Sequence, residues 1–228
     1  MNSAGYIALF RKELRGAAGV IAIAAAVQGV WLLSQMPEMM WLANLVNGGA
    51  STQPFVGGGF YSGFAWTTAM FAAAIGFWQT LSESLGHAGT WPFLLYRPVS
   101  RRGLVLTKLA VGAGSVMLLS AAVIVSYAAY GTWIAQTAIP FEWSMTHRAW
   151  HLWLWPPLIY LGAFLSGLRP ARWLGTRLWP AALSVVPWFA SKSVPYWIWW
   201  PGEAALAVLL GAWFVVVILD VVSERDFG

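Results

Sequence analysis

Charge is what this sequence most lacks. Only 9% of its 228 residues are Asp, Glu, Lys or Arg, whereas 59% are hydrophobic. Soluble domains carry about 25% charged residues, because a surface that faces water needs them. This composition excludes an ordinary soluble domain and indicates an integral membrane protein.

Cysteine is absent and histidine is scarce. Without cysteine the chain can form neither a disulfide nor a thiolate metal site. The three histidines, His87, His147 and His151, lack the HExxH spacing of a zinc protease helix. We therefore expect no metal on this chain.

The basic residues do not form the pattern of a nucleic-acid-binding protein. The formal net charge is +5, but the cations lie between apolar runs, without a solvated basic face or stacking aromatics. Nucleic acid is therefore excluded as an expected partner, and membrane lipids are expected instead. No cleavable signal peptide is predicted, because Arg11, Lys12 and Arg15 lie late and no convincing cleavage site follows.

Long uncharged runs are what the sequence has in place of charge. A membrane-spanning helix needs about 20 mostly apolar residues, because hydrocarbon offers no partners for its backbone. The uncharged windows that we expect to cross are residues 16–33, 60–81, 109–136, 152–168, 178–191 and 204–222. The sequence thus predicts an all-α integral membrane protein, one domain over residues 1–228 with six transmembrane helices.

The fifth window, residues 178–191, is short and contains Pro180 and Pro187. It is followed by Lys192 and the stretch VPYWIWWPG, rich in the tryptophans that collect at membrane interfaces. We expect this helix to end early and residues 192–202 to form a broken hairpin outside the cytoplasm.

The cations are distributed unevenly among the connections. Six crossings place eleven of the thirteen Lys and Arg residues on one side, and leave Arg148 and Lys192 on the other. Because cytoplasmic loops retain the excess of Lys and Arg, both termini are expected in the cytoplasm.

Residues 1–15 have the pattern of an amphipathic helix that lies in the membrane interface. Apolar side chains fall on one face, with Arg11, Lys12 and Arg15 on the other. Glu13 projects among the apolar side chains, where a carboxylate is costly unless paired. We expect a cation beside it, with Arg101 and Arg102 as candidates; the alternative is a glutamate that tilts out to headgroup water.

The connection after the second window combines prolines with cations. Gly89 and Thr90 can start a short helix with Trp91 and Pro92 in its first turn, and Pro98 can end it. A new helix can follow, capped by Ser100 and carrying the last cations of the connection. The cations of this connection are Arg97, Arg101, Arg102 and Lys108.

This connection resembles that of the membrane subunits of bacterial ATP-binding-cassette transporters of the exporter-type (type two) permease family. The matching positions are Glu83, Gly89, Thr90, Leu94, Leu95, Pro98, Val99, Ser100, Arg101 and Lys108. The N-terminal FRKELR, residues 10–15, is similar to the interfacial helix with which those permeases begin. The chain departs from the family at Trp91-Pro92 and in the spacing between Glu83 and Gly89.

The resemblance implies that residues 83–102 form a cytoplasmic coupling helix that docks on a separate ATPase subunit. The implied coupling residues are Glu83, Gly89, Thr90, Trp91, Pro92, Arg97, Pro98, Arg101 and Arg102. A GxxxxGK[ST] loop is absent from the chain, so ATP and magnesium are expected on the partner and no enzymatic activity is expected here. A second permease subunit, identical or related, would complete the pathway in the bacterial cytoplasmic (inner) membrane.

The resemblance implies a permease subunit that exports its substrate, and a hydrophobic or amphipathic substrate is expected because the crossings contain almost no charge. One alternative is a membrane assembly or structural factor without transport. A lipid- or peptide-processing membrane enzyme is less favoured, because only Glu203 and Asp220 lie near a crossing and no pair of catalytic groups shares a face.

Overall fold

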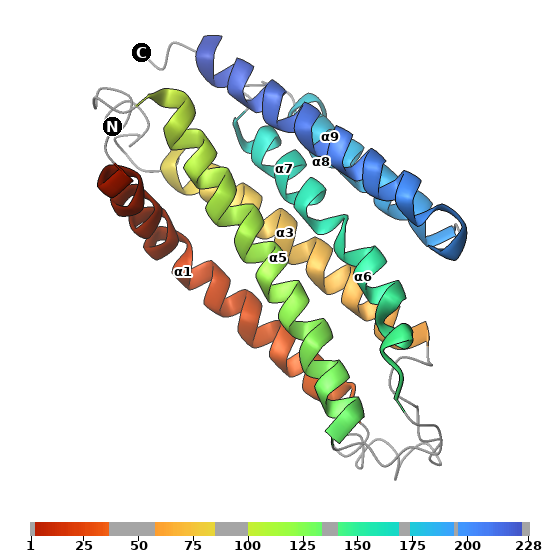
Figure 1. The fold of residues 1–228 in the computed structure, drawn as a ribbon. Helices are drawn as coiled ribbons and strands as arrows, with labels where there is room; N and C mark the ends of the chain where they lie inside the picture. The colour runs from red at the N-terminus through yellow and green to blue at the C-terminus, as the bar shows by residue number, and fades with distance from the viewer. Residues whose placement is uncertain are drawn as a thin grey trace.

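All secondary structure in the described part of the chain is helical. The computed structural model describes residues 3–36, 58–84, 100–133, 141–168, 174–193 and 196–224. The prediction of an all-α protein is confirmed for these ranges (Figure 1). The helices are α1 (Ser3–Ser34), α3 (Gly58–Ser84), α5 (Arg101–Trp133), the 3-10 turn η1 (Trp143–Thr146), α6 (His147–Trp153), α7 (Pro156–Leu168), α8 (Leu174–Ser193) and α9 (Tyr196–Glu224).

Three of these helices contain stretches that are long and apolar enough to cross a membrane. The stretches are Ile7–Ser34 in α1, Arg102–Trp133 in α5 and Pro201–Glu224 in α9. Their length and composition are compatible with a membrane-embedded protein. The other expected crossings lack this support, and α7, with 13 residues, is only about 20 Å long against a hydrocarbon core of about 30 Å.

The N-terminal segment is not a separate helix. α1 runs without interruption from Ser3 to Ser34, so the predicted interfacial helix over residues 1–15 is wrong as an independent element. The 32 residues of α1 contain no proline and many alanines, so nothing breaks the backbone hydrogen bonding near residue 15. Its first turns therefore continue into the apolar part that follows without a break in the helix.

The predicted crossing at residues 152–168 is interrupted. α6 ends at Trp153, and α7 begins at Pro156 after Leu154 and Trp155. Proline is favoured at a first helical position because its missing N–H would have no partner there. Pro156 therefore starts a new helix, and the expected single helix is wrong.

Within the expected broken hairpin at residues 192–202, the described residues 192–193 and 196–202 are helical. α8 continues through Pro180 and Pro187 to Ser193, and α9 starts at Tyr196 and continues through Pro201. Pro201 lies near the start of α9, where it removes a single intrahelical hydrogen bond. Only residues 194–195 therefore separate two long helices.

α7 is the central helix of the bundle. It contacts α3, α5, α8 and α9 (Figure 1), and most of its side chains are buried. A methyl group added at Gly76 of α3 would come within 2.6 Å of the carbonyl oxygen of Tyr160, and one at Gly162 within 2.7 Å of that of Pro180 in α8. Small residues thus let the backbones of neighbouring helices approach α7, as in many membrane bundles.

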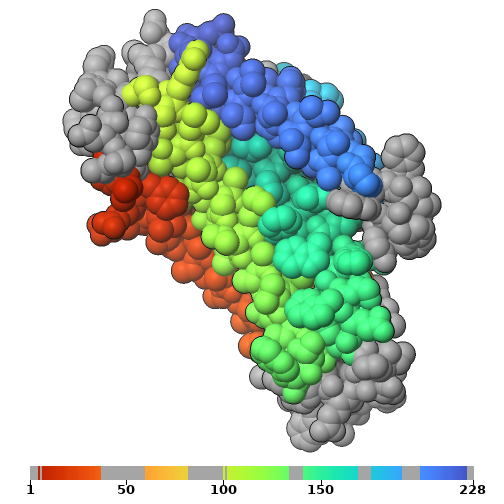
Figure 2. Space-filling model, in the orientation of Figure 1, coloured from red at the N-terminus to blue at the C-terminus, as the bar shows by residue number. Residues whose placement is uncertain are grey.

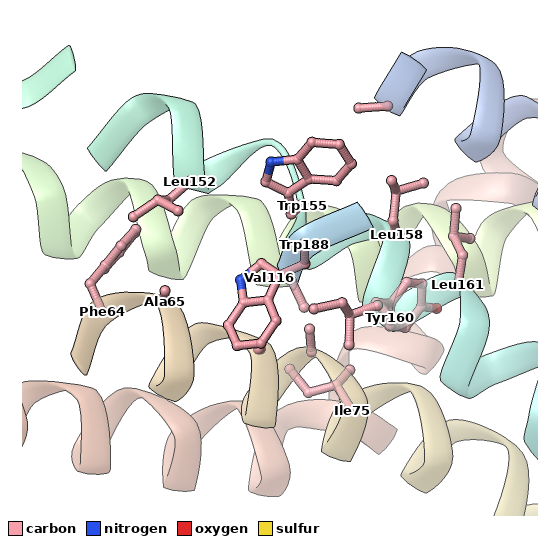
Figure 3. Packing of buried hydrophobic residues seen from close by; sticks show 14 of the residues in the cluster. Phe64, Ala65, Ile75, Val116, Leu152, Trp155, Leu158, Tyr160, Leu161 and Trp188 are labelled. Atoms are coloured by element: carbon pink, nitrogen blue, oxygen red, sulfur yellow. The ribbon is translucent and has the colours of Figure 1, made fainter. Parts of the chain in front are cut away.

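Aromatic side chains fill the space on both sides of the break between α6 and α7. Trp155 and Trp188 are each 1% exposed and Tyr160 is fully buried. Figure 3 shows Trp155 and Trp188 close to the aliphatic side chains around Val116 and Leu158. The core therefore continues across the interruption.

Candidate functional site

A buried ion pair joins α1 to α5. The Nζ atom of Lys108 lies 2.6 Å from Oε2 of Glu13, and the two side chains are 2% and 7% exposed. A charge removed from water is tolerated when an opposite charge lies this close. The pair therefore holds the N-terminal part of α1 against the second turn of α5.

Polar contacts continue from this pair into the centre of the bundle. Oη of Tyr160 in α7 donates a hydrogen bond to Oε1 of Gln79 in α3, at 2.6 Å. The same Oη atom lies 3.3 Å from the carbonyl oxygen of Lys108. Glu13, Lys108, Tyr160 and Gln79, which we call the polar cluster, thus connect α1, α5, α7 and α3.

The polar cluster has hydrogen-bonding capacity that the described residues do not use. Oε1 of Glu13 and Nε2 of Gln79 are buried and have no hydrogen-bond partner in the described part of the chain. Leaving such atoms unpaired costs about 1 to 3 kcal/mol each. The polar cluster therefore has one acceptor and one donor group in the core that the helix contacts leave unsatisfied.

A second ionisable pair lies on α6 and α9. His151 is buried, and its Nε2 contacts Oε2 of Glu203. Arg177 of α8 makes a further interhelical contact, donating hydrogen bonds to the carbonyl oxygens of Ser166 and Gly167 at the end of α7. Polar contacts thus fasten α9 to α6 and α8 to α7.

The expected cation beside Glu13 is present, but its identity differs from the prediction. Lys108 is the partner; Arg102 is exposed, and the side chain of Arg101 lies outside the description. Glu13 lies on the face of α1 that packs against α5. It therefore meets a cation two turns into α5 instead of one at its first turn.

Sequence reasoning also missed the contact between Tyr160 and Gln79 and the pair of His151 with Glu203. The sequence identifies Glu203 only as a carboxylate near a crossing. Polar residues within otherwise apolar helices are a signal for interhelical partners. Which residues meet depends on helix rotation and register, which the sequence pattern alone does not give.

Most of the predicted coupling segment lies outside the described residues. The predicted coupling residues outside the described part of the chain are Gly89, Thr90, Trp91, Pro92, Arg97 and Pro98. Glu83 lies in the last turn of α3, but its side chain is not among those described.

The described residues at the start of α5 bear out one local prediction. Ser100 caps this helix, because its Oγ accepts a hydrogen bond from the backbone N–H of Gly103 at 3.2 Å. On α1, Arg11 and Arg15 are exposed, as expected for the polar side of this segment.

No protein-family model, no curated protein and no solved structure matches this chain. Within the described residues, no cluster of three or more His, Asp or Glu side chains could hold a metal ion. The polar contacts between helices are therefore the features from which a function can be inferred.

Proposed function

We propose that this chain is the permease subunit of an ATP-binding-cassette transporter, and that it exports a hydrophobic or amphipathic substrate. The observation that carries the proposal is the buried pair of Glu13 and Lys108. Lys108 lies on α5, which begins at Arg101, within the end of the proposed coupling segment at residues 83–102. A push on this segment would reach α5 first, and the ion pair would pass it on to α1.

The polar cluster extends the same link to the centre of the bundle. The contacts of Tyr160 and Gln79 would transmit a movement of α5 to α7 and α3. Coupling between distant sites requires an element with two arrangements that both sites bias. The polar cluster is a suitable element, because its unpartnered atoms can take other partners when the helices move.

The remaining parts of the proposal follow the resemblance. The chain would cross the bacterial cytoplasmic membrane six times with both termini inside, pair with a second permease subunit, and bind an ATPase subunit that holds ATP and magnesium. Export of an amphipathic substrate agrees with a bundle in which Glu13 is paired with Lys108 and His151 with Glu203.

The test is to co-express the tagged chain with candidate ATP-binding-cassette ATPase subunits from the same genome and to purify the complex. We expect co-purification, ATP hydrolysis by the complex, and no hydrolysis by the isolated chain. Arg97→Glu should weaken capture of the ATPase, whereas Arg148→Glu, whose arginine is expected on the opposite side, should not.

A membrane assembly or structural factor without transport is the alternative function. It would show no capture of an ATPase and no ATP-dependent movement of substrate in proteoliposomes. Turnover of ATP by the isolated chain would refute both functions.

A further inference from the structure

A shallow groove of about 500 Å³ runs between the N-terminal parts of α1 and α5. Its walls are mostly apolar and open to the surroundings: Ile7, Phe10 and Leu106 are 54%, 43% and 44% exposed. Figure 2 shows the N-terminal part of α1, in red, against the first half of α5, in yellow-green. The lining residues are Ile7, Phe10, Gly103, Leu106, Thr107 and Ala110.

Arginines flank this groove on both helices. Arg11 follows Ile7 by four residues on α1, and Arg102 precedes Leu106 by four residues on α5. Residues four apart on a helix lie on the same face, and both arginines are exposed. Each arginine therefore lies one turn from a residue that lines the groove on its own helix, and its long side chain can extend along the surface beside the groove.

We propose that this groove binds an anionic phospholipid, with one acyl chain between α1 and α5 and the headgroup phosphate held by Arg11 and Arg102. The apolar walls match an acyl chain, and the two guanidinium groups match a phosphate, which arginine binds through paired hydrogen bonds. Basic sites between transmembrane helices are a recurrent way to hold anionic headgroups. The proposal needs only a membrane-embedded chain and does not depend on transport.

Charge decides between this lipid and a second copy of the chain. The exposed cations on this part of α1 are Arg11, Lys12 and Arg15, with Arg102 nearby on α5. A symmetric contact between two copies would bring the same surface patch together with itself, and like charges oppose each other across such a contact. An anionic lipid instead neutralises them.

The test uses the full chain in nanodiscs and its natural lack of cysteine. Thr107→Cys places a single fluorescent label in the groove, and Ile23→Cys places one on an exposed position of α1 about two turns beyond Arg15, its last cation. The probes are phosphatidylglycerol and phosphatidylcholine with the same nitroxide on one acyl chain. We expect phosphatidylglycerol to quench the label at position 107 at a lower mole fraction than phosphatidylcholine, and no such preference at position 23.

Variants of the flanking cations identify the headgroup contacts. Arg11→Gln and Arg102→Gln should each lower the preference about fivefold, the equivalent of about 1 kcal/mol per cation near a membrane surface. Lys12→Gln is the matched control on the far side of α1 and should leave the preference unchanged. Arg11→Lys and Arg102→Lys keep the charge and should retain most of it.

Three results would overturn the proposal. They are equal quenching by both lipids at position 107, a preference that persists when both arginines are replaced by glutamine, and no quenching by either lipid together with cross-linking between labelled positions of two chains. The last result would assign the groove to a second copy.

Discussion

Glu13 and Lys108 are 7% and 2% exposed, and each supplies the charge that the other needs. A buried pair of this kind is not in itself strong evidence for stability, because both charges lose their hydration. Removing one partner does destabilise the protein, since the remaining buried charge then has no opposite charge beside it. The pair therefore constrains how α1 lies against α5 more than it strengthens the fold.

Glu13→Gln and Lys108→Met should each destabilise the protein by about 3 to 5 kcal/mol, the range for a stranded buried charge. The double variant should cost less than the sum of the two, because it leaves no uncompensated charge. Unfolding by SDS in mixed micelles measures these free energies. Arg15→Gln, an exposed change on the same helix, should stay within about 0.5 kcal/mol of the parent. Strict additivity would mean that the two side chains do not interact in solution.

The contact between His151 and Glu203 allows a second measurement of the same kind on α9. Glu203→Gln removes a charged acceptor from a buried histidine and should cost about 1.5 to 3 kcal/mol, the range for hydrogen bonds to charged groups. Asp220→Asn on the same helix is exposed and should be nearly neutral. Thermal unfolding followed by tryptophan fluorescence distinguishes the two. Equal melting temperatures for both variants would contradict an anchoring role for Glu203.

At the scale of helices, the fold depends on the short distances between the backbone of α7 and those of its neighbours. Gly76 in α3 faces the backbone of α7, whereas Gly114 in α5 has open space around the position of a Cβ atom. The same substitution at these two glycines therefore has opposite expected effects.

Gly76→Ala should destabilise the protein by about 1 to 3 kcal/mol, because the new methyl group would lie 2.6 Å from the carbonyl oxygen of Tyr160 and α3 would have to move away. Gly114→Ala should stabilise it by up to about 1 kcal/mol, since alanine loses less backbone entropy than glycine in a helix. SDS unfolding midpoints of the two variants test the difference. A stable Gly76→Ala variant would show that the packing of α3 on α7 is looser than described.

The positions of the long helices could be predicted from the sequence, but their boundaries could not. The windows at residues 16–33, 60–81 and 204–222 lie within α1, α3 and α9, because a long uncharged run specifies a helix with few alternatives. The change from polar to apolar at residue 16 does not break the backbone of α1, so the expected interfacial helix merges with it. A polarity change marks a change of surroundings rather than a helix end.

At the scale of the whole molecule, the sequence predicts part of the candidate site but not which residues meet there. That Glu13 needs a cation follows from its place among apolar residues, and a cation is present. That the cation is Lys108 follows from the packing of α1 beside α5, which brings together residues 95 positions apart. Such a contact depends on the rotation and register of two helices, which the sequence pattern does not predict.

The number of crossings is the property of the whole molecule that most needs measurement. In Figure 1 the start of α1 and the end of α9 lie at the same end of the bundle. An even number of crossings, such as the proposed six, leaves both of these ends on one side of the membrane. Crossing by only the three stretches in α1, α5 and α9 would place them on opposite sides.

Single cysteines in this cysteine-free chain decide between six crossings and three. Ala8→Cys and Ser223→Cys are exposed positions near the two ends, and a membrane-impermeant maleimide should reach both only from the cytoplasmic side. Ser144→Cys, exposed before α6, should react from the opposite side, and Thr176→Cys from the cytoplasmic side. Labelling in intact cells and in inverted vesicles, each with permeabilised controls, measures this. Reaction of positions 8 and 223 from opposite faces would exclude six crossings and leave α3, α7 and α8 as helices that do not each span the bilayer.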